Sequence, residues 1–252
     1  MKYLINTYSQ LPLEIVKGKG SFIWDKNGKK YLDFYGGHAV CIIGHCPKKV
    51  TKAIVSQSQK LLFYSNIVKT LPQEILAKIL AQTLLPEKYQ LYFSNSGSEA
   101  NETAIKIARK HTGKNHIISF EDAFHGRSIT NLSVTGIKSY HQFDPNLLNY
   151  TSFAKLGDIN SVKKAFNKDT ATVICEPIQS MGGINMADKK FYKELADFCK
   201  QNNLILIFDE IQTGLGRTGK FWFCDILGVK PDIITCAKGL ASGLPISATI
   251  VK

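Results

Sequence analysis

From residue 89 onward, short apolar runs rich in β-branched residues alternate with segments of helical periodicity. Helical spacing falls between the runs, at residues 99–111, 161–166 and 189–202. Such alternation is typical of a mostly parallel, doubly wound sheet. Because the runs are apolar throughout, we expect both faces of the sheet to be covered. The sequence therefore predicts an α/β fold with six strands, at residues 90–95, 116–120, 172–176, 204–209, 233–237 and 247–251.

The chain before residue 89 has a different pattern. Residues 14–34 predict a short β-meander, in which Asn27-Gly28 is a strong hairpin signal. Residues 47–60 and 72–84 have helical character. The strand-helix alternation therefore begins only after this part of the chain.

Charge and composition narrow the class of protein. The 252 residues carry a net charge of +12, which could suit nucleic acid or a membrane surface. The lysines are scattered and form no basic run of five, so a solvated basic surface is the better interpretation, compatible with anionic substrates. No apolar run approaches membrane-spanning length, and the N-terminus lacks the apolar core of a signal peptide. We expect a cytoplasmic protein with no nucleic-acid or membrane partner.

The six cysteines do not suggest a metal site. They form no CxxC pair, and Cys41 and Cys46 have no matching pair downstream. Cys175 and Cys236 lie inside apolar runs, where cysteine acts as a small buried hydrophobe. We expect reduced thiols and no bound metal.

Two of the predicted strands end in ionisable residues. Asp209 ends one run, and Lys238 directly follows the next. In an open α/β sheet, ligands bind at the carboxyl ends of the strands, so both side chains are expected at the same edge. Pyridoxal phosphate (PLP) requires two such groups of a protein: an Asp that pairs with its pyridinium nitrogen and a Lys that forms an imine with it. The pair alone is only suggestive, because a lysine after an apolar run is common.

A third predicted strand leads into a possible anion site. Ser96 and Glu99 have the spacing of a capping box at the start of a helix, and Gly97 allows close approach of the backbone to a ligand. The N–H groups and dipole of a helix N-terminus favour an anion such as phosphate. A plain helix cap is the alternative interpretation.

Two further loops at strand ends carry functional residue types. Phe124 could stack on a planar ring, and Arg127 could bind a carboxylate with its bidentate fork. A loop with a packed Phe and a surface Arg is equally compatible. Glu176 ends another strand, before Pro177 and a Gly-Gly pair. The joint placement of all these groups at one edge of the sheet favours a ligand site.

The chain resembles the class III (subgroup II) PLP-dependent aminotransferases, and within them the acetylornithine/succinylornithine aminotransferase branch. The resemblance extends over essentially all of the chain. The segments that carry it are KGKG (17–20), YLDFYGGH (31–38), IGHC (43–46), NSGSEANETAIK (95–106), FHGR (124–127), FDEIQTGLGRTG (208–219) and AKG (237–239).

The resemblance implies a role for each site residue. Lys238 would carry PLP covalently, Asp209 would hold the pyridine nitrogen protonated, and Gln212 would lie near the ring hydroxyl. Gly97 and Ser98 would hold the phosphate, and Phe124 would stack on the ring. On the substrate side, Arg127 would bind the α-carboxylate and Glu176 would lie nearby.

The resemblance also implies a fold and a reaction. The fold would be the fold-type I PLP transferase, with residues 1–46 as the N-terminal segment of the small domain and residues 47–252 as the PLP-binding large domain. The rest of the small domain, at the C-terminal side, is expected to be absent from this chain. A homodimer would transfer the amino group between N-acetylornithine or N-succinylornithine and 2-oxoglutarate, in arginine biosynthesis. Two alternatives are an inactive PLP-binding fragment and an ornithine or 4-aminobutyrate aminotransferase.

Overall fold

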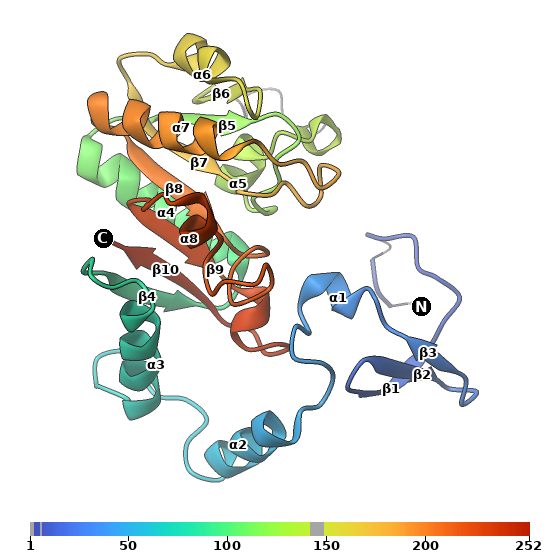
Figure 1. The fold of residues 1–252 in the computed structure, drawn as a ribbon. Helices are drawn as coiled ribbons and strands as arrows, with labels where there is room; N and C mark the ends of the chain where they lie inside the picture. Colours follow the sequence, from blue (N-terminus) through green and yellow to red (C-terminus); the bar gives the residue numbers. More distant parts are fainter. Residues whose placement is uncertain (1–2, 6, 142–148) are drawn as a thin grey trace. The chain divides into compact units, whose positions relative to one another are not determined.

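The computed structural model describes residues 3–5, 7–141 and 149–252. The chain forms two compact units, residues 1–65 and residues 66–252. Each unit is described by itself (Figure 1). The predicted boundary after residue 46 stays a prediction.

The second unit is built on a seven-stranded mixed sheet in the order β4-β10-β9-β8-β7-β5-β6. Its strands are β4 (Gln90–Ser94), β5 (His116–Phe120), β6 (Thr151–Ala154), β7 (Thr170–Cys175), β8 (Ile205–Asp209), β9 (Ile233–Cys236) and β10 (Ser247–Val251). Strands β6, β5, β7, β8 and β9 pair in parallel, whereas β10 is antiparallel to both of its neighbours, β4 and β9. The mostly parallel α/β sheet is therefore confirmed, and all six predicted strands are present.

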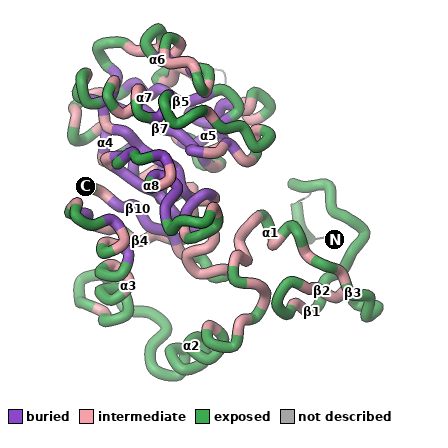
Figure 2. The backbone as a smooth tube through the Cα atoms, viewed as in Figure 1, coloured by how far each residue is buried: buried purple, intermediate pink, exposed green. Residues whose placement is uncertain are grey.

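Helices cover both faces of this sheet. On one face, alternate strand residues such as Ile117 and Ile207 pack on α4 (Gly97–Thr112) and α5 (Ile129–Val134). On the other face, their neighbours, such as Ile118 and Phe208, pack in one cluster with the remaining helices. Those helices are α3 (Leu71–Gln82), α6 (Ile159–Ala165), α7 (Lys189–Gln201) and α8 (Phe223–Leu227). Figure 2 shows the buried residues concentrated along these strands, as expected for a sheet covered on both sides.

The sequence pattern did not predict strand β6, helix α5 or the five-residue helix α8. The edge strand β6 is a four-residue, mostly half-buried segment, too short to form a recognisable apolar run. Helix α5 contains Ile129, Thr130 and Val134, which are β-branched and have only modest helix propensity. Burial of Leu132 and Val134 against the sheet stabilises this helix in place of propensity.

The first unit contains the predicted meander. Strands β1 (Ile15–Lys19), β2 (Phe22–Asp25) and β3 (Lys30–Leu32) form an antiparallel sheet. The Asp25 carboxylate accepts hydrogen bonds from the N–H groups of Asn27 and Lys29 and from the Tyr31 hydroxyl, and Gly28 takes the left-handed conformation that the turn needs. The helical segments α1 (Gly36–Ala39) and α2 (Lys48–Ser58) follow.

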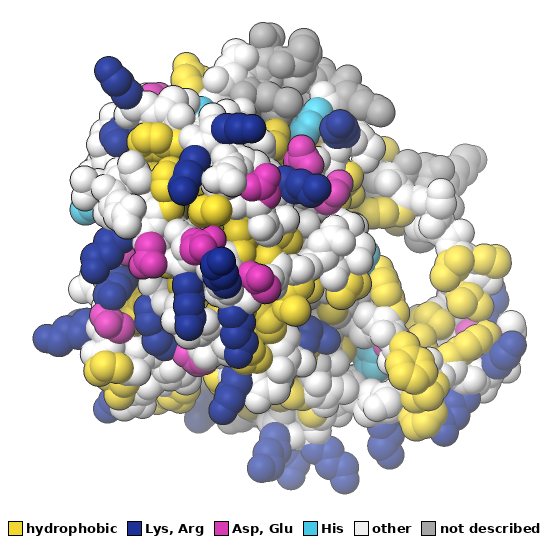
Figure 3. Space-filling model, turned by 45° about the horizontal axis from the view of Figure 1, so that its top comes forward, with side chains coloured by type: hydrophobic (Ala, Val, Ile, Leu, Met, Phe, Trp, Pro, Cys, Tyr) yellow, Lys and Arg dark blue, Asp and Glu magenta, His cyan; other side chains and the backbone are white. Residues whose placement is uncertain are grey.

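The surface agrees with the interpretation of the charge. On the face shown in Figure 3, Lys and Arg side chains are spread out and interspersed with Asp and Glu. Among the described residues, no helix is long and apolar enough to cross a membrane, and no cluster of His, Cys, Asp and Glu could hold a metal ion.

Candidate active site

The predicted site residues meet at the carboxyl edge of the parallel strands. Asp209 is the last residue of β8, and Lys238 begins the short 3-10 helix η3 (Lys238–Leu240) just after β9. Strands β8 and β9 are parallel neighbours, with Asp209 paired to Thr235. The two ionisable groups therefore lie at one edge, as the order of strands in the sequence predicts.

Asp209 is a buried carboxylate with a full set of donors. Its Oδ2 accepts hydrogen bonds from Asn101 Nδ2 at 2.7 Å and from His125 Nδ1 at 2.8 Å. Its Oδ1 accepts the backbone N–H of Ile211 at 3.1 Å. Only 4% of Asp209 is exposed, so these three donors replace the water that a charged carboxylate needs. The arrangement holds a negative charge at a defined place in the site.

A second layer of hydrogen bonds fixes the donors themselves. Asn101 Nδ2 also donates to the carbonyl of His125 at 2.8 Å, and Asn101 Oδ1 accepts the Thr235 hydroxyl at 2.7 Å. Helix α4, the loop after β5 and strand β9 are thus tied together behind Asp209. Within this network, His125 Nε2 is buried and has no hydrogen-bond partner among the described residues. The remaining bonds favour one arrangement of the surrounding backbone.

Lys238 is held toward the same place. Its Nζ donates to Gln212 Oε1, which also accepts the Ser180 hydroxyl at 2.9 Å. Burial lowers the pKa of Lys238, while the nearby carboxylates Asp209 and Glu176 partly oppose this effect. A lowered pKa makes the neutral amine, which can act as a nucleophile or base, more accessible.

The backbone at Lys238 is itself unusual. Its φ of 37° lies in the left-handed region, which costs a residue with a side chain about 1–2 kcal/mol. Strain of this kind is common at functional sites, where the surrounding structure holds it in place.

Helix α4 begins at the same edge. The Ser96 hydroxyl accepts the N–H of Glu99 at 3.2 Å, and the Glu99 carboxylate accepts the N–H of Asn95 at 2.9 Å, so the predicted capping box is present. Gly97 and Ser98 are the first two helical residues, whose N–H groups have no partner within the helix. A Cβ on Gly97 would meet Ile211 Cδ1 at 2.7 Å, so this helix end packs directly on the loop after Asp209.

Glu176 is buried beneath the loop that carries Phe124. Its Oε1 accepts the N–H of Phe124 at 2.7 Å, and burial raises its pKa from 4.5 to about 7. The Phe124 ring packs against Tyr140, with ring centroids 5.6 Å apart. Glu176 therefore fixes the backbone of the aromatic residue in addition to any contact with substrate.

Arg127 is exposed and lies between two residues that contact the start of α4. Its neighbour Ser128 donates its N–H to Ser98 Oγ at 3.4 Å, and a Cβ on Gly126 would meet the same Oγ at 2.6 Å. The structure thus brings four predicted residues into one cluster: Lys238 contacts Gln212 and interacts with the charges of Asp209 and Glu176. Gly97 packs against Ile211, in the loop after Asp209. Ser98, in the first turn of α4, contacts the adjoining loop, which contains Arg127.

Four site residues were not predicted as such: Asn101, His125, Thr235 and Glu210. The sequence pattern could have indicated Asn101, because it is a polar residue on the apolar, buried face of α4, which also holds Ala104, Ile105 and Ala108. Thr235 gave none, since a Thr inside a β-branched run is indistinguishable from an ordinary strand residue. His125 and Glu210 each adjoin a predicted residue, and only the fold shows which way they point.

Glu210 secures the loop that contains Gln212. Its carboxylate is fully buried and accepts the N–H groups of Phe223 at 2.7 Å and Cys224 at 2.8 Å, at the start of α8. The Thr213 hydroxyl donates to it at 3.3 Å. These bonds close the loop between β8 and α8.

The titration of Glu210 predicts a pH dependence of stability. Burial raises its pKa from 4.5 to about 7, so the folded state holds a proton that the unfolded chain releases. The proton on Glu210 contributes about 3 kcal/mol to the free energy of unfolding. This contribution is complete below pH 4.5 and is lost as the pH rises from 4.5 through 7. Urea unfolding between pH 4.5 and 8 should therefore show a free energy of unfolding that depends less steeply on pH in Glu210→Gln than in the parent chain.

The exposed Glu121 offers a matched control. Glu121→Gln should leave the slope of stability against pH unchanged. An unaltered slope in Glu210→Gln would show that Glu210 does not titrate in this range.

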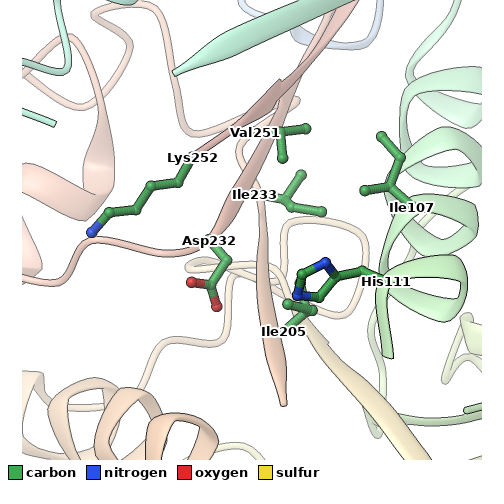
Figure 4. Close-up of a pocket in the computed structure, with 7 residues that line it drawn as sticks. All are labelled: Ile107, His111, Ile205, Asp232, Ile233, Val251 and Lys252. Atoms are coloured by element: carbon green, nitrogen blue, oxygen red, sulfur yellow. The ribbon is translucent and has the colours of Figure 1, made fainter. Parts of the chain in front are cut away.

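A separate hollow of about 180 Å³ lies at the opposite edge of the sheet (Figure 4). It is lined by Ile205 and Ile233, the first residues of β8 and β9, and by Val251, the last residue of the antiparallel β10. Ile107, His111, Asp232 and Lys252 complete the lining. Asp209 stands at the other end of β8, so this hollow is not part of the candidate active site.

Comparison with known proteins assigns the family. The model of the class-III aminotransferases matches residues 3–252. The chain belongs to the class-III aminotransferase family, whose members are PLP-dependent. The fold agrees, because solved transaminases superimpose on nearly the whole chain.

Individual relatives are more specific. The chain is 44% identical to the acetylornithine aminotransferase of Aquifex aeolicus, covering all of this chain and 68% of the relative, and 43% identical to that of Methanocaldococcus jannaschii, covering 64% of it. Among solved structures, the ornithine aminotransferase of Toxoplasma gondii matches with a TM-score of 0.92 at 30% identity, over 99% of this chain and 61% of that one. The N-acetylornithine aminotransferase of Stenotrophomonas maltophilia matches with a TM-score of 0.83 at 31% identity, over 98% and 64%. The chain thus spans about two thirds of the length of its relatives.

Proposed function

We propose that the chain forms the PLP-binding part of an aminotransferase that acts on N-acetylornithine or N-succinylornithine, with 2-oxoglutarate and glutamate as the second pair, in arginine biosynthesis. The observation that carries the proposal is the pairing of a buried, fully hydrogen-bonded Asp209 with a part-buried Lys238 at one sheet edge. The names of the most similar curated relatives support the substrate.

The donor set of the site fits PLP. A carboxylate held by three donors suits a protonated ring nitrogen, and an amine of lowered pKa suits a covalent link. The first turn of α4, with the Ser98 hydroxyl, suits a phosphate dianion. Lys238, Asp209, Gln212, Gly97, Ser98 and Phe124 are the residues proposed to hold the cofactor.

Each of these residues has a task that follows from its surroundings. When bound, PLP supplies an electron sink for the substrate carbon that loses a proton. Lys238 Nζ is the group proposed to take that proton and return it, because burial lowers its pKa and so favours the neutral amine. Gln212 Oε1 orients Nζ, and Asp209 would supply a negative charge to the ring nitrogen of the bound cofactor. Arg127 is proposed to bind the substrate carboxylate, with Glu176 beside it.

The assignment of a substrate within the family depends on sequence identity rather than on similarity of the backbone. The chain is 44% identical to an acetylornithine enzyme and 30% identical to an ornithine enzyme, although the TM-score to the latter is 0.92. Backbone similarity does not distinguish substrates, because specificity depends on side chains in the pocket. Turnover with acetylornithine, succinylornithine, ornithine and 4-aminobutyrate separates the candidates, and a preference for either of the last two would refute the acylornithine assignment.

The homodimer that the resemblance implies and the cytoplasmic location expected from the sequence are part of the same proposal. Light scattering of the purified chain measures the assembly. A monomer at micromolar concentration would contradict the dimer.

Covalent labelling tests the cofactor site directly. The purified chain is mixed with PLP and reduced with borohydride, and the modified residue is mapped by mass spectrometry. We expect the label on Lys238, and we expect it to remain there in Lys220→Ala, which removes an exposed lysine of the loop before α8. A label spread over surface lysines would refute the site. A label on Lys238 without turnover of any of the four amines would support the alternative of an inactive PLP-binding chain.

A further inference from the structure

A buried asparagine lies directly behind the proposed phosphate site. Asn131, in the middle of α5, is 0% exposed. Its Nδ2 donates to the carbonyl of Ser98 at 2.6 Å and to Ser98 Oγ at 2.8 Å. Asn131 therefore contacts the carbonyl and the hydroxyl of Ser98, the second residue of α4.

The orientation of the Asn131 amide follows from its partners. The carbonyl oxygen of Ser98 can only accept, so the amide nitrogen must face it. Asn131 Oδ1 is then turned away, and it has no hydrogen-bond partner among the described residues. The two bonds from Nδ2 thus hold the amide in this orientation, at the cost of an unpaired oxygen.

These contacts determine what the Ser98 hydroxyl can do. Its oxygen accepts from Asn131 Nδ2 at 2.8 Å and from the N–H of Ser128 at 3.4 Å, which uses both lone pairs. Its own hydrogen remains to be donated. The partner within reach is Ser128 Oγ at a long 3.3 Å, and the Ser128 hydroxyl itself donates to Glu102 at 2.6 Å. A better acceptor can therefore take the Ser98 hydrogen bond at little cost.

The packing around this group is close. A Cβ on Gly126 would meet Ser98 Oγ at 2.6 Å and Asn131 Nδ2 at 3.1 Å, and the φ of Gly126 is 125°. The backbone of Gly126 therefore packs closely against both the Ser98 hydroxyl and the Asn131 amide. This packing favours the position in which the hydroxyl meets its two donors.

We propose that Asn131 is a positioning residue that fixes the Ser98 hydroxyl as a hydrogen-bond donor to the phosphate of the cofactor. The inference rests on the proposed PLP site and extends it to a residue that does not touch the ligand. Its distinctive consequence is selectivity for the phosphate, since Asn131 has no part in holding the ring.

The test compares the affinities of the full 252-residue chain for PLP and for pyridoxal, which lacks the phosphate. Asn131→Ala removes the donor, and we expect it to weaken PLP binding about tenfold, as for loss of one hydrogen bond to a charged group. Asn131→Asp presents acceptors to the Ser98 hydroxyl and adds a negative charge, so we expect a loss of about 100-fold. Pyridoxal affinity should not change in either variant, so the ratio of the two dissociation constants is the readout.

Two controls separate positioning from structural damage. Ser133→Ala removes another buried polar group of α5, one that donates to Thr130 O at 2.6 Å, and should leave the ratio unchanged. In a Ser98→Ala background, Asn131→Ala should have no further effect on the ratio, because the two residues act through one hydroxyl.

The outcomes are distinct. An unchanged ratio in both Asn131 variants, or an equal loss of PLP and pyridoxal affinity, overturns the role of Asn131 while labelling at Lys238 still supports the cofactor site. A parent chain that binds no PLP and takes no label at Lys238 overturns both proposals.

Discussion

Lys238→Ala is expected to lower the rate of amino transfer by about 10²–10⁴-fold or more, the usual contribution of a positioned acid–base group. The rate falls because the substitution removes Nζ, the proposed acid–base group, which donates to Gln212 and interacts with the charge of Asp209. Single-turnover reactions, followed by the absorbance of PLP after addition of the amino donor, measure the rate. A small amine added to Lys238→Ala should restore part of it.

Two further substitutions at this position sharpen the result. Lys238→Arg keeps the positive charge but cannot release a proton near neutral pH, so it should be as inactive as the alanine variant. Lys238→Gly relieves the left-handed backbone, so it should be about 1 kcal/mol more stable than Lys238→Ala, with equally low activity. Full activity in any of these variants would remove Lys238 from the chemistry.

Asp209→Asn is expected to impair both stability and amino transfer. The amide can present one oxygen, so either Ile211 or the pair of Asn101 and His125 would face an NH₂ group in place of an acceptor. An unsatisfied buried donor costs about 1–3 kcal/mol of unfolding free energy. Loss of the preorganised charge should lower the rate by about 10²–10³-fold.

The same substitution at the other edge of the sheet is the matched control. Asp232 accepts the N–H of Leu206 at 2.8 Å, so Asp232→Asn also disturbs a carboxylate that holds a backbone amide. It should reduce stability and leave PLP affinity and single-turnover rate unchanged. If Asp209→Asn lowers stability by the same amount but keeps its rate, Asp209 is a structural residue only.

Much of the fold could be predicted because its signals are local. Uninterrupted apolar runs such as residues 204–208 predicted the strands, and the ends of these runs predicted the edge at which Asp209 and Lys238 meet. The hairpin at Asn27-Gly28 and the capping box at Ser96 follow from the chemistry of a few neighbouring residues. Each of these features requires no knowledge of distant parts of the chain.

The remainder depends on contacts between distant segments. Nothing near Asn131 indicates that it lies against Ser98, 33 residues earlier, and the bond from Asn101 to Asp209 spans 108 residues. The left-handed backbone of Lys238 is likewise set by its surroundings, because lysine has no preference for it. The sequence therefore predicted Asp209 as a site residue. It did not predict the hydrogen bonds that join Asp209 to its buried partners.

The position of β10 in the sheet has a consequence for synthesis on the ribosome. Among the described strands, β4 pairs only with β10, and the hydrogen bond between Ser94 and Ser247 joins residues 153 apart in the chain. At about 5–20 residues per second, β4 waits roughly 8–30 seconds for its partner to be made. During that interval its edges are unpaired and open to non-native association. Helix α4, which follows β4, packs on β10 as well as on β7 and β9, so its packing, and that of the proposed phosphate site at its start, is complete only after β10 has been made.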